Sequence, residues 1–170
     1  MVSWTLKQQR DPKVLNRLQR TQESIYAQLQ CLIPDWQAAD GYWVSQAPSS
    51  QPLHVEMLEV HPYTTFLHMT HHFDGPTPIV SQPEAHVRCY HDLRIAEVTA
   101  FDVVQGIERV AHPKLPARAV QELSWQRNRS LEKWLQYLLD KGHCRSTMRA
   151  SRSTAGHLEA TFGKKNVATI

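Results

Sequence analysis

The segment AHVRCYHDLRIAEVTAF, residues 85–101, decides the fold of this chain. Apolar residues alternate with polar ones from Ala85 to Cys89, which is the period of a strand with one buried face. A tight connection at residues 91–93 would return residues 95–101 as a second, antiparallel strand. The segment therefore predicts a β-hairpin, and one long, bulged strand is the alternative.

Three more strands are expected before this hairpin. Residues 42–45 are short and aromatic, residues 53–57 alternate in polarity, and residues 64–73 alternate again. Leu58 follows the apolar Met57 directly, so the alternation slips by one residue and indicates a bulge.

The remaining connections carry turn residues. Asp74-Gly75-Pro76 predicts a turn, because glycine accepts positive φ and proline fixes its own φ. Residues 77–83 are expected to form a loop and residues 112–116 a proline-bracketed connector. Residues 103–110 leave room for a further edge strand.

A helix is predicted at each end of the strand region. The first begins at an Asp-Pro pair at positions 11–12, carries one apolar stripe, and ends at Pro34. The second begins near Ser124, or as early as Ala117, and ends at Gly142, a residue typical of helix C-termini. Strands segregated between two helices predict an α+β fold, in which both helices pack on one face of an antiparallel sheet of about five strands.

Charge divides the chain into two regions. Residues 1–142 carry 14 lysines and arginines against 15 aspartates and glutamates, whereas residues 143–170 carry five against one. We therefore expect one α+β domain at 1–142 and a basic, disordered tail at 143–170. The expected domain at residues 1–142 has no excess of basic residues that would indicate nucleic-acid binding.

The cysteines and the hydropathy indicate a compartment. The chain has three cysteines, at positions 31, 89 and 144, which is an odd number, and no two of them have C-x-x-C spacing. Both facts favour a reducing cytoplasm over a disulfide framework. No secretory signal is visible, and no apolar run approaches the roughly 18 residues of a membrane span. The phosphate-binding and serine-hydrolase motifs are also absent. We expect a cytoplasmic protein with no membrane contact.

Several motifs together resemble a family. They are Tyr63-Thr64-Thr65, Val87-Arg88-Cys89-Tyr90-His91-Asp92, Ala96-Glu97-Val98 and Trp134-Leu135. In this order they are similar to the YqiB-like family of uncharacterised bacterial proteins, over roughly residues 13–142. The resemblance implies a cytosolic bacterial protein of this fold, and it implies no reaction. The basic tail and the histidines at 68, 71 and 72 depart from the pattern.

Catalytic candidates cluster in the hairpin. His91, Asp92 and Glu97 could perform acid–base chemistry, because a carboxylate can orient an imidazole and keep it basic. Tyr90 and His91 point to opposite faces of a strand, however, so convergence needs a turn. The structural interpretation is favoured: Asp92 would satisfy turn amides and Arg88 would pair with Glu97.

Ligand-contact candidates come from the same region. Tyr63, Thr64 and Thr65 could line a groove beside Arg88 and Tyr90. These five residues are the candidate binding residues.

The histidines do not predict a metal site. His68 and His72 would lie about 13 Å apart along one strand, too far to share an ion. His68 would be nearer to His86 or His54 on adjacent strands, but no spacing in the sequence establishes either pair. We therefore predict no metal and no cofactor.

Three functions remain open. The first is a binding or accessory module that holds an unidentified protein or small molecule. The second is an enzyme that uses His91 and Asp92, with or without a metal. The third is an RNA-associated protein that acts through the tail together with Arg127 and Arg129, although weak, salt-sensitive contacts are all that five basic residues would give.

Overall fold

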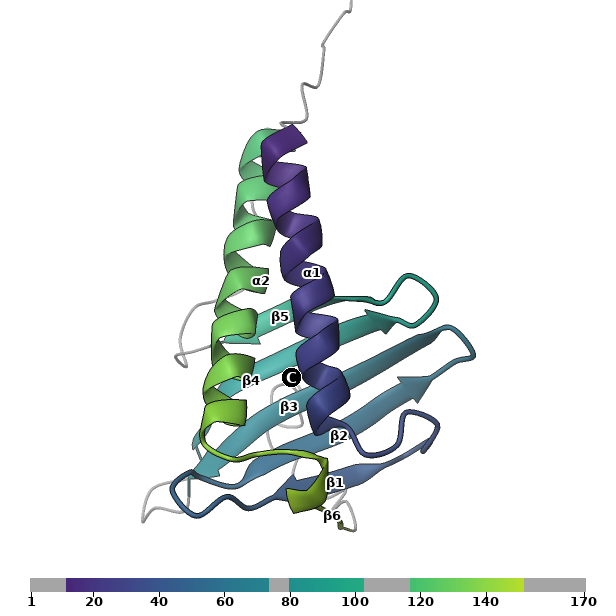
Figure 1. Ribbon diagram of the computed structural model, residues 1–170, viewed down its shortest axis with the longest axis vertical. Helices are drawn as coiled ribbons and strands as arrows, with labels where there is room; N and C mark the ends of the chain where they lie inside the picture. Colours follow the sequence, from purple (N-terminus) through teal and green to yellow (C-terminus); the bar gives the residue numbers. More distant parts are fainter. Residues whose placement is uncertain (1–11, 74–79, 103–116, 152–170) are drawn as a thin grey trace, which may run out of the picture.

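The computed structural model describes residues 12–73, 80–102 and 117–151, and these residues form two layers (Figure 1). One layer is a six-stranded sheet in the order β5-β4-β3-β2-β1-β6. The other layer is a pair of helices. The arrangement confirms the predicted α+β class, with one strand more than the expected number.

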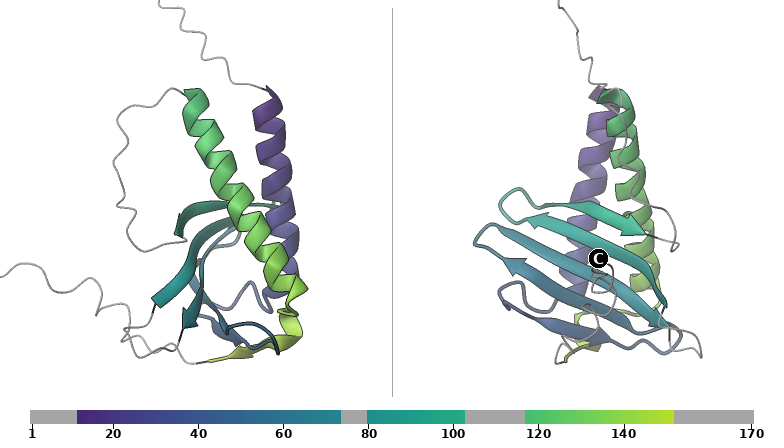
Figure 2. Two further views of the ribbon diagram at one scale, coloured as in Figure 1. Left: turned by 90° about the vertical axis from the view of Figure 1, so that its left-hand side faces the viewer. Right: turned by 180° about the vertical axis from the view of Figure 1, so that it is seen from behind.

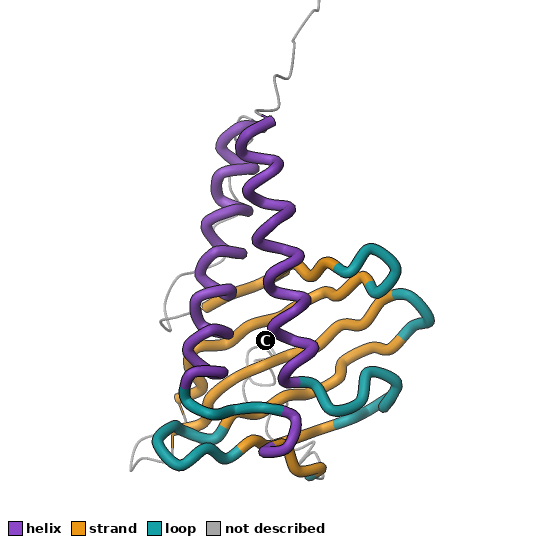
Figure 3. Tube along the Cα trace, viewed as in Figure 1, coloured by secondary structure: helices purple, strands orange, loops and turns teal. Residues whose placement is uncertain are grey.

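Every neighbouring pair of strands is antiparallel. The strands are β1 (Tyr42–Ser45), β2 (Leu53–Val60), β3 (Thr64–Phe73), β4 (Val80–Tyr90), β5 (Ile95–Asp102) and β6 (Met148–Ala150). Short loops join β1 to β2, β2 to β3 and β4 to β5 (Figure 3). The expected slip after Met57 is found as a register shift between Met57 and Glu59.

The hairpin predicted from residues 85–101 is present. Tyr90 pairs with Ile95, and a four-residue turn at residues 91–94 connects the two strands. Arg94 closes this turn in the left-handed region, at φ 54°. A single long strand is therefore ruled out for this segment.

Two helices cover one face of the sheet. They are α1 (Pro12–Leu32) and α2 (Ala117–Asp140), and they run side by side in the same direction (Figure 1; Figure 2, left). Both begin beyond the β5 edge of the sheet and descend across it. The second helix takes the earlier of the two predicted starts, and Gly142 follows its end with φ 93°.

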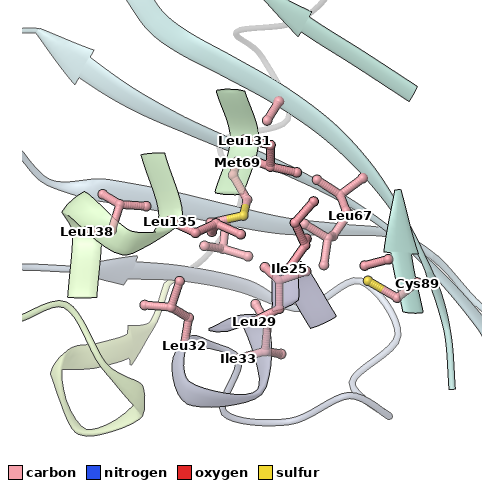
Figure 4. Close-up of a cluster of buried hydrophobic side chains, with 14 of the residues drawn as sticks. Ile25, Leu29, Leu32, Ile33, Leu67, Met69, Cys89, Leu131, Leu135 and Leu138 are labelled. Carbon is pink, nitrogen blue, oxygen red and sulfur yellow. The ribbon is translucent and has the colours of Figure 1, made fainter. Parts of the chain in front are cut away.

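The core lies between the helices and the sheet. On β3, Thr65, Leu67 and Met69 are buried, as the alternation predicts. Figure 4 shows strand residues of this core together with residues of α2, of α1 and of the position just after α1, namely Leu67, Met69, Cys89, Leu131, Leu135, Leu138, Ile25, Leu29, Leu32 and Ile33. Each fully buried Leu or Ile stabilises the fold by about 1.5–3 kcal/mol, so the core between the helices and the sheet is the main source of stability.

The predicted tail begins later than expected. Residues 143–151 extend the fold: a short 3₁₀ helix, η1 (Arg145–Thr147), leads into β6, which pairs with β1. His143 and Met148 are buried, at 1% and 5% exposure. The prediction of disorder is therefore wrong for residues 143–151, whereas residues 152–170 lie outside the described residues.

The loop expected at residues 77–83 is also wrong in part, because β4 already begins at Val80. Pro83 is accommodated because the register of β3 and β4 shifts between Thr70 and His72, which leaves residues of β4 without a ladder partner. The expectations for residues 74–76, 103–110 and 112–116 fall outside the described residues. Within the described residues, neither helix combines the length and apolarity needed to cross a bilayer.

Candidate functional site

The face of the sheet turned away from the helices carries the candidate site. Figure 2, right, shows this face with the helices behind it. We call it the outer face and define it by the outward side chains of β2 to β5, which include His54, Glu56, Glu59, Thr64, Phe66, His68, Thr70, Glu84, His86, Arg88, Tyr90 and Glu97. These side chains alternate with the buried core residues, so strand geometry alone places them together.

Arg88, Tyr90 and Glu97 form a connected network on the outer face. Arg88 Nη1 donates to Tyr90 Oη at 3.3 Å, and Tyr90 Oη donates to Glu97 Oε1 at 3.0 Å. Arg88 Nη1 also lies 3.6 Å from Glu97 Oε1, across the register pair Arg88↔Glu97. The Arg88 guanidinium stacks over the Phe66 ring, 4.7 Å from its centroid. We call these four residues the Arg88 cluster.

His91 turns to the opposite, helix-covered side. Its Nδ1 is hydrogen-bonded to Tyr26 Oη at 3.0 Å, and its Nε2 to Thr65 Oγ1 at 2.8 Å. The Trp36 ring stands edge-on to it, with 5.0 Å between centroids. Burial lowers the pKa of His91, against a smaller opposing effect of Asp92. The imidazole is therefore neutral near pH 7, with both nitrogens already in use.

The predicted acid–base group is not assembled. Asp92 is exposed in the turn, and Glu97 lies on the outer face, bonded to Tyr90 rather than to His91. A shallow groove of about 520 Å³ lies between α1 and the β4–β5 turn, but among the described residues its lining includes neither His91 nor Asp92. The geometry corrects the hypothesis that His91, Asp92 and Glu97 converge on one reacting atom.

The five candidate binding residues are divided between the two sides. Arg88 and Tyr90 lie on the outer face, with Thr64 opposite Tyr90 on β3. Thr65 points to the core and holds His91. Tyr63 is 69% exposed in the β2–β3 turn, where its carbonyl accepts the His91 N–H at 2.9 Å.

A second polar group lies on the outer face: the sequence left the pair of His68 with His86 open, and Glu84 was missed. His68 and His86 are register partners on β3 and β4, and Glu84 lies two residues before His86 on the same face. Glu84 Oε1 lies 3.0 Å from His68 Nε2 and 3.5 Å from His86 Nε2. The useful signal was the pairing of β3 with β4, which the sequence alone does not fix. His54 pairs with Thr70 rather than with His68, and the ligand atoms that lie together among the described residues are those of His68, Glu84 and His86.

Two further histidines are buried near the end of α2. His71 Nδ1 donates to the Pro52 carbonyl at 3.0 Å, and His143 Nδ1 is hydrogen-bonded to Ser45 Oγ at 2.8 Å. Ser45 is fully buried and also bonds Thr147 Oγ1 at 2.6 Å. Burial is the largest cause that lowers the pKa of both imidazoles. These hydrogen bonds connect residues 143–148 to β1. Because Ser45 is buried, its hydroxyl is not accessible from solvent.

No curated protein and no solved structure matches the chain. A family model, described as a protein of unknown function (DUF1249), matches residues 28–144, which is more than half of the sequence. The match runs from the end of α1, through β1 to β5 with the Arg88 cluster and with His68, Glu84 and His86, to just past α2, and β6 lies beyond it. The chain therefore belongs to the DUF1249 family of proteins of unknown function.

Proposed function

We propose that this protein is a small binding module that holds a protein partner on its outer face. The observation that carries the proposal is the Arg88 cluster, an arginine, a tyrosine, a glutamate and a phenylalanine gathered on the sheet face that the helices leave uncovered. Tyrosine and arginine are enriched among the residues that dominate protein–protein binding energy.

Pre-organisation supports the same interpretation. Tyr90, Glu97 and the Phe66 ring each restrain the Arg88 side chain. A restrained arginine loses less conformational entropy on binding than one that moves freely in solvent, so more of its contact energy appears as affinity. Its pKa is raised, chiefly by the hydrogen bond to Tyr90, and the group is a permanent cation.

The two turns at the end of the sheet where β4 finishes add exposed apolar area, and Leu93 in one of them lines the groove beside α1. Tyr63 is 69% exposed and Leu93 is 62% exposed, and they lie in the β2–β3 and β4–β5 turns. The hydrogen bond from His91 N–H to the Tyr63 carbonyl holds the two turns side by side. Large exposed apolar side chains next to a polar cluster are typical of interaction surfaces.

The competing functions have less support among the described residues. An enzyme using His91 would need a carboxylate to orient the imidazole, but its nitrogens bond the hydroxyls of Tyr26 and Thr65, and Glu97 bonds Tyr90 on the other side of the sheet. The proposed RNA contact depends largely on a tail whose residues 152–170 lie outside the described part, so it stays a prediction.

The origin and compartment also belong to this proposal. Three free cysteines, at positions 31, 89 and 144, support a reducing compartment, and we propose the bacterial cytoplasm. The motifs around Tyr63 and Arg88 support placement with the YqiB-like proteins.

Quantitative capture from native lysate tests the proposed function. Three baits are compared: the unmodified protein, a Tyr63→Ala, Arg88→Ala variant, and a Tyr137→Ala, Arg129→Ala control. The control removes an exposed tyrosine and an exposed arginine from α2. We expect a specific protein to be recovered with the unmodified bait and the control, and to be reduced at least tenfold with the outer-face variant. Equal recovery with all three baits, or no specific protein with any, would refute the proposal.

A further inference from the structure

The group of His68, Glu84 and His86 presents three metal-binding atoms at one place. One nitrogen from each imidazole and one carboxylate oxygen all lie within 4.8 Å of one another. The two ε nitrogens approach the same oxygen, at 3.0 and 3.5 Å. The two rings are 4.7 Å apart between centroids and tilted by 36°.

These separations are close to those that a bound ion requires. Ligand atoms about 2.0–2.1 Å from a tetrahedral zinc ion are about 3.3 Å apart. The two histidine–glutamate distances lie on either side of that value, so small side-chain rotations would suffice. The backbone need not move, because His68 and His86 are already direct partners across the β3–β4 ladder.

The strand pairing is irregular on both sides of the group, next to Glu84 and at His86. The β3–β4 register shifts between Thr70 and His72, next to Glu84, and the β4–β5 register shifts between His86 and Val87. Thr99, the extra residue of the second shift, donates its hydroxyl to the His86 carbonyl at 3.1 Å. Register shifts of this kind re-aim side chains and are enriched beside functional sites.

The burial of the ligands is graded. The His68 side chain is 12% exposed, while Glu84 and His86 are 36% and 38% exposed. A bound ion would therefore be shielded from solvent on the side of His68 and open to solvent on the side of Glu84 and His86. Three protein ligands with one open position are typical of zinc sites that bind water or a further ligand.

We propose that His68, Glu84 and His86 bind one divalent transition-metal ion of the zinc class. Two imidazoles and a carboxylate suit zinc, cobalt and nickel, and disfavour magnesium and calcium, which prefer oxygen ligands. The site adjoins the Arg88 cluster, because His86 and Arg88 are outward neighbours on β4. The proposal goes beyond the binding function and does not depend on it.

Titration calorimetry of the untagged protein with Zn²⁺ tests the site. We expect one ion per chain, and affinity at least about 100-fold weaker in a His68→Asn, His86→Asn variant. Glu84→Gln should weaken binding by about 10- to 100-fold, since the amide can keep a hydrogen bond but supplies a poorer ligand. Co²⁺ should give visible absorption bands with the unmodified protein that disappear in the double variant.

The chain offers a matched control in His61. Its Nε2 lies 3.2 Å from Glu59 Oε2, so this pair has the same chemistry, and within residues 12–73, 80–102 and 117–151 it does not form a group of three metal-binding side chains. His61→Ala should leave the stoichiometry and affinity unchanged, and circular dichroism should show that each variant is folded. Absence of a one-to-one complex in the unmodified protein would overturn the proposal. Equal affinity in the control and in a folded double variant would do the same.

Discussion

Tyr90 and His91 are adjacent in the chain, yet they serve opposite sides of the sheet. Tyr90 donates to Glu97 on the outer face, while His91 bonds Tyr26 and Thr65 on the helix side. The two residues at the end of β4 therefore have different roles. Tyr90 belongs to the outer face, and His91 connects the β4–β5 turn to α1. Variants at the two positions should separate binding from stability.

Substitution of His91 should destabilise the fold. His91→Ala leaves Tyr26 Oη and Thr65 Oγ1 without their partner, and a lost, partly buried hydrogen-bonding group costs about 1–3 kcal/mol. Asp92→Ala, one residue further on, removes an exposed side chain and should change the free energy of unfolding by less than about 0.5 kcal/mol. Urea denaturation of both variants measures the difference, and equal losses would contradict the assignment of His91.

Acid should weaken the fold through the buried histidines. Burial lowers the folded-state pKa of His143, so the folded protein keeps this imidazole neutral. Below about pH 6.5, the ordinary pKa of histidine, the unfolded chain takes up a proton that the folded chain refuses. The free energy of unfolding should therefore fall as pH decreases below that value.

His143→Gln isolates this contribution, because glutamine does not titrate. Urea denaturation at several pH values between 7.5 and 5 should give a shallower pH dependence for the variant than for the unmodified protein. Identical slopes would show that His143 does not resist protonation in the folded state.

Residues 143–151 should contribute to stability although the sequence predicts a tail there. Met148 is 5% exposed and part of the core, so Met148→Ala should cost about 2–5 kcal/mol. The neighbouring Arg149 is exposed, and Arg149→Ala should change stability by less than about 0.5 kcal/mol. Thermal melts of the pair decide the matter: if both melt like the unmodified protein, β6 is not part of the folded core.

The three thiols should differ in reactivity. Cys89 is fully buried in the core, and burial raises its pKa, so no thiolate is available to a reagent. Cys31 is exposed and Cys144 is partly exposed, and hydrogen bonding with Ser146 is the largest cause that lowers the pKa of Cys144. Alkylation followed by peptide mapping should label Cys31 and Cys144 in the native protein and Cys89 only after denaturation. Comparable labelling of all three without denaturant would contradict the packing.

Local patterns predicted the elements that bury a periodic face. The alternation through Thr65, Leu67 and Met69 fixed β3 because every second residue meets the helices. The start of α2 was harder to predict for a physical reason: its first turns lie beyond the sheet, Val120 is 52% exposed, and contact is with α1, where Arg17 stacks on Trp125. Because the first turns of α2 bury few side chains, their sequence carries no clear stripe of apolar residues that would predict a helix.

Non-local pairing accounts for the rest. In β6 only Met148 is buried, and the two residues after it are exposed. The local sequence therefore does not distinguish β6 from a tail, and the strand is fixed by its pairing with β1. The prediction of no metal site excluded His68 with His72 along one strand and left the pairs of His68 with His86 or His54 unestablished. The proximity of His68 to His86 depends on the β3–β4 register, which rests on contacts distant in sequence.

Site-specific photo-cross-linking in cells tests the central claim most directly, namely that the outer face binds a partner. A benzophenone amino acid would replace Thr64, the partner of Tyr90 across the β3–β4 ladder, and, separately, Tyr137, an exposed tyrosine of α2. We predict a covalent adduct with a specific protein from position 64 and none from position 137. An adduct from position 137 alone, or none from either position, would contradict the account.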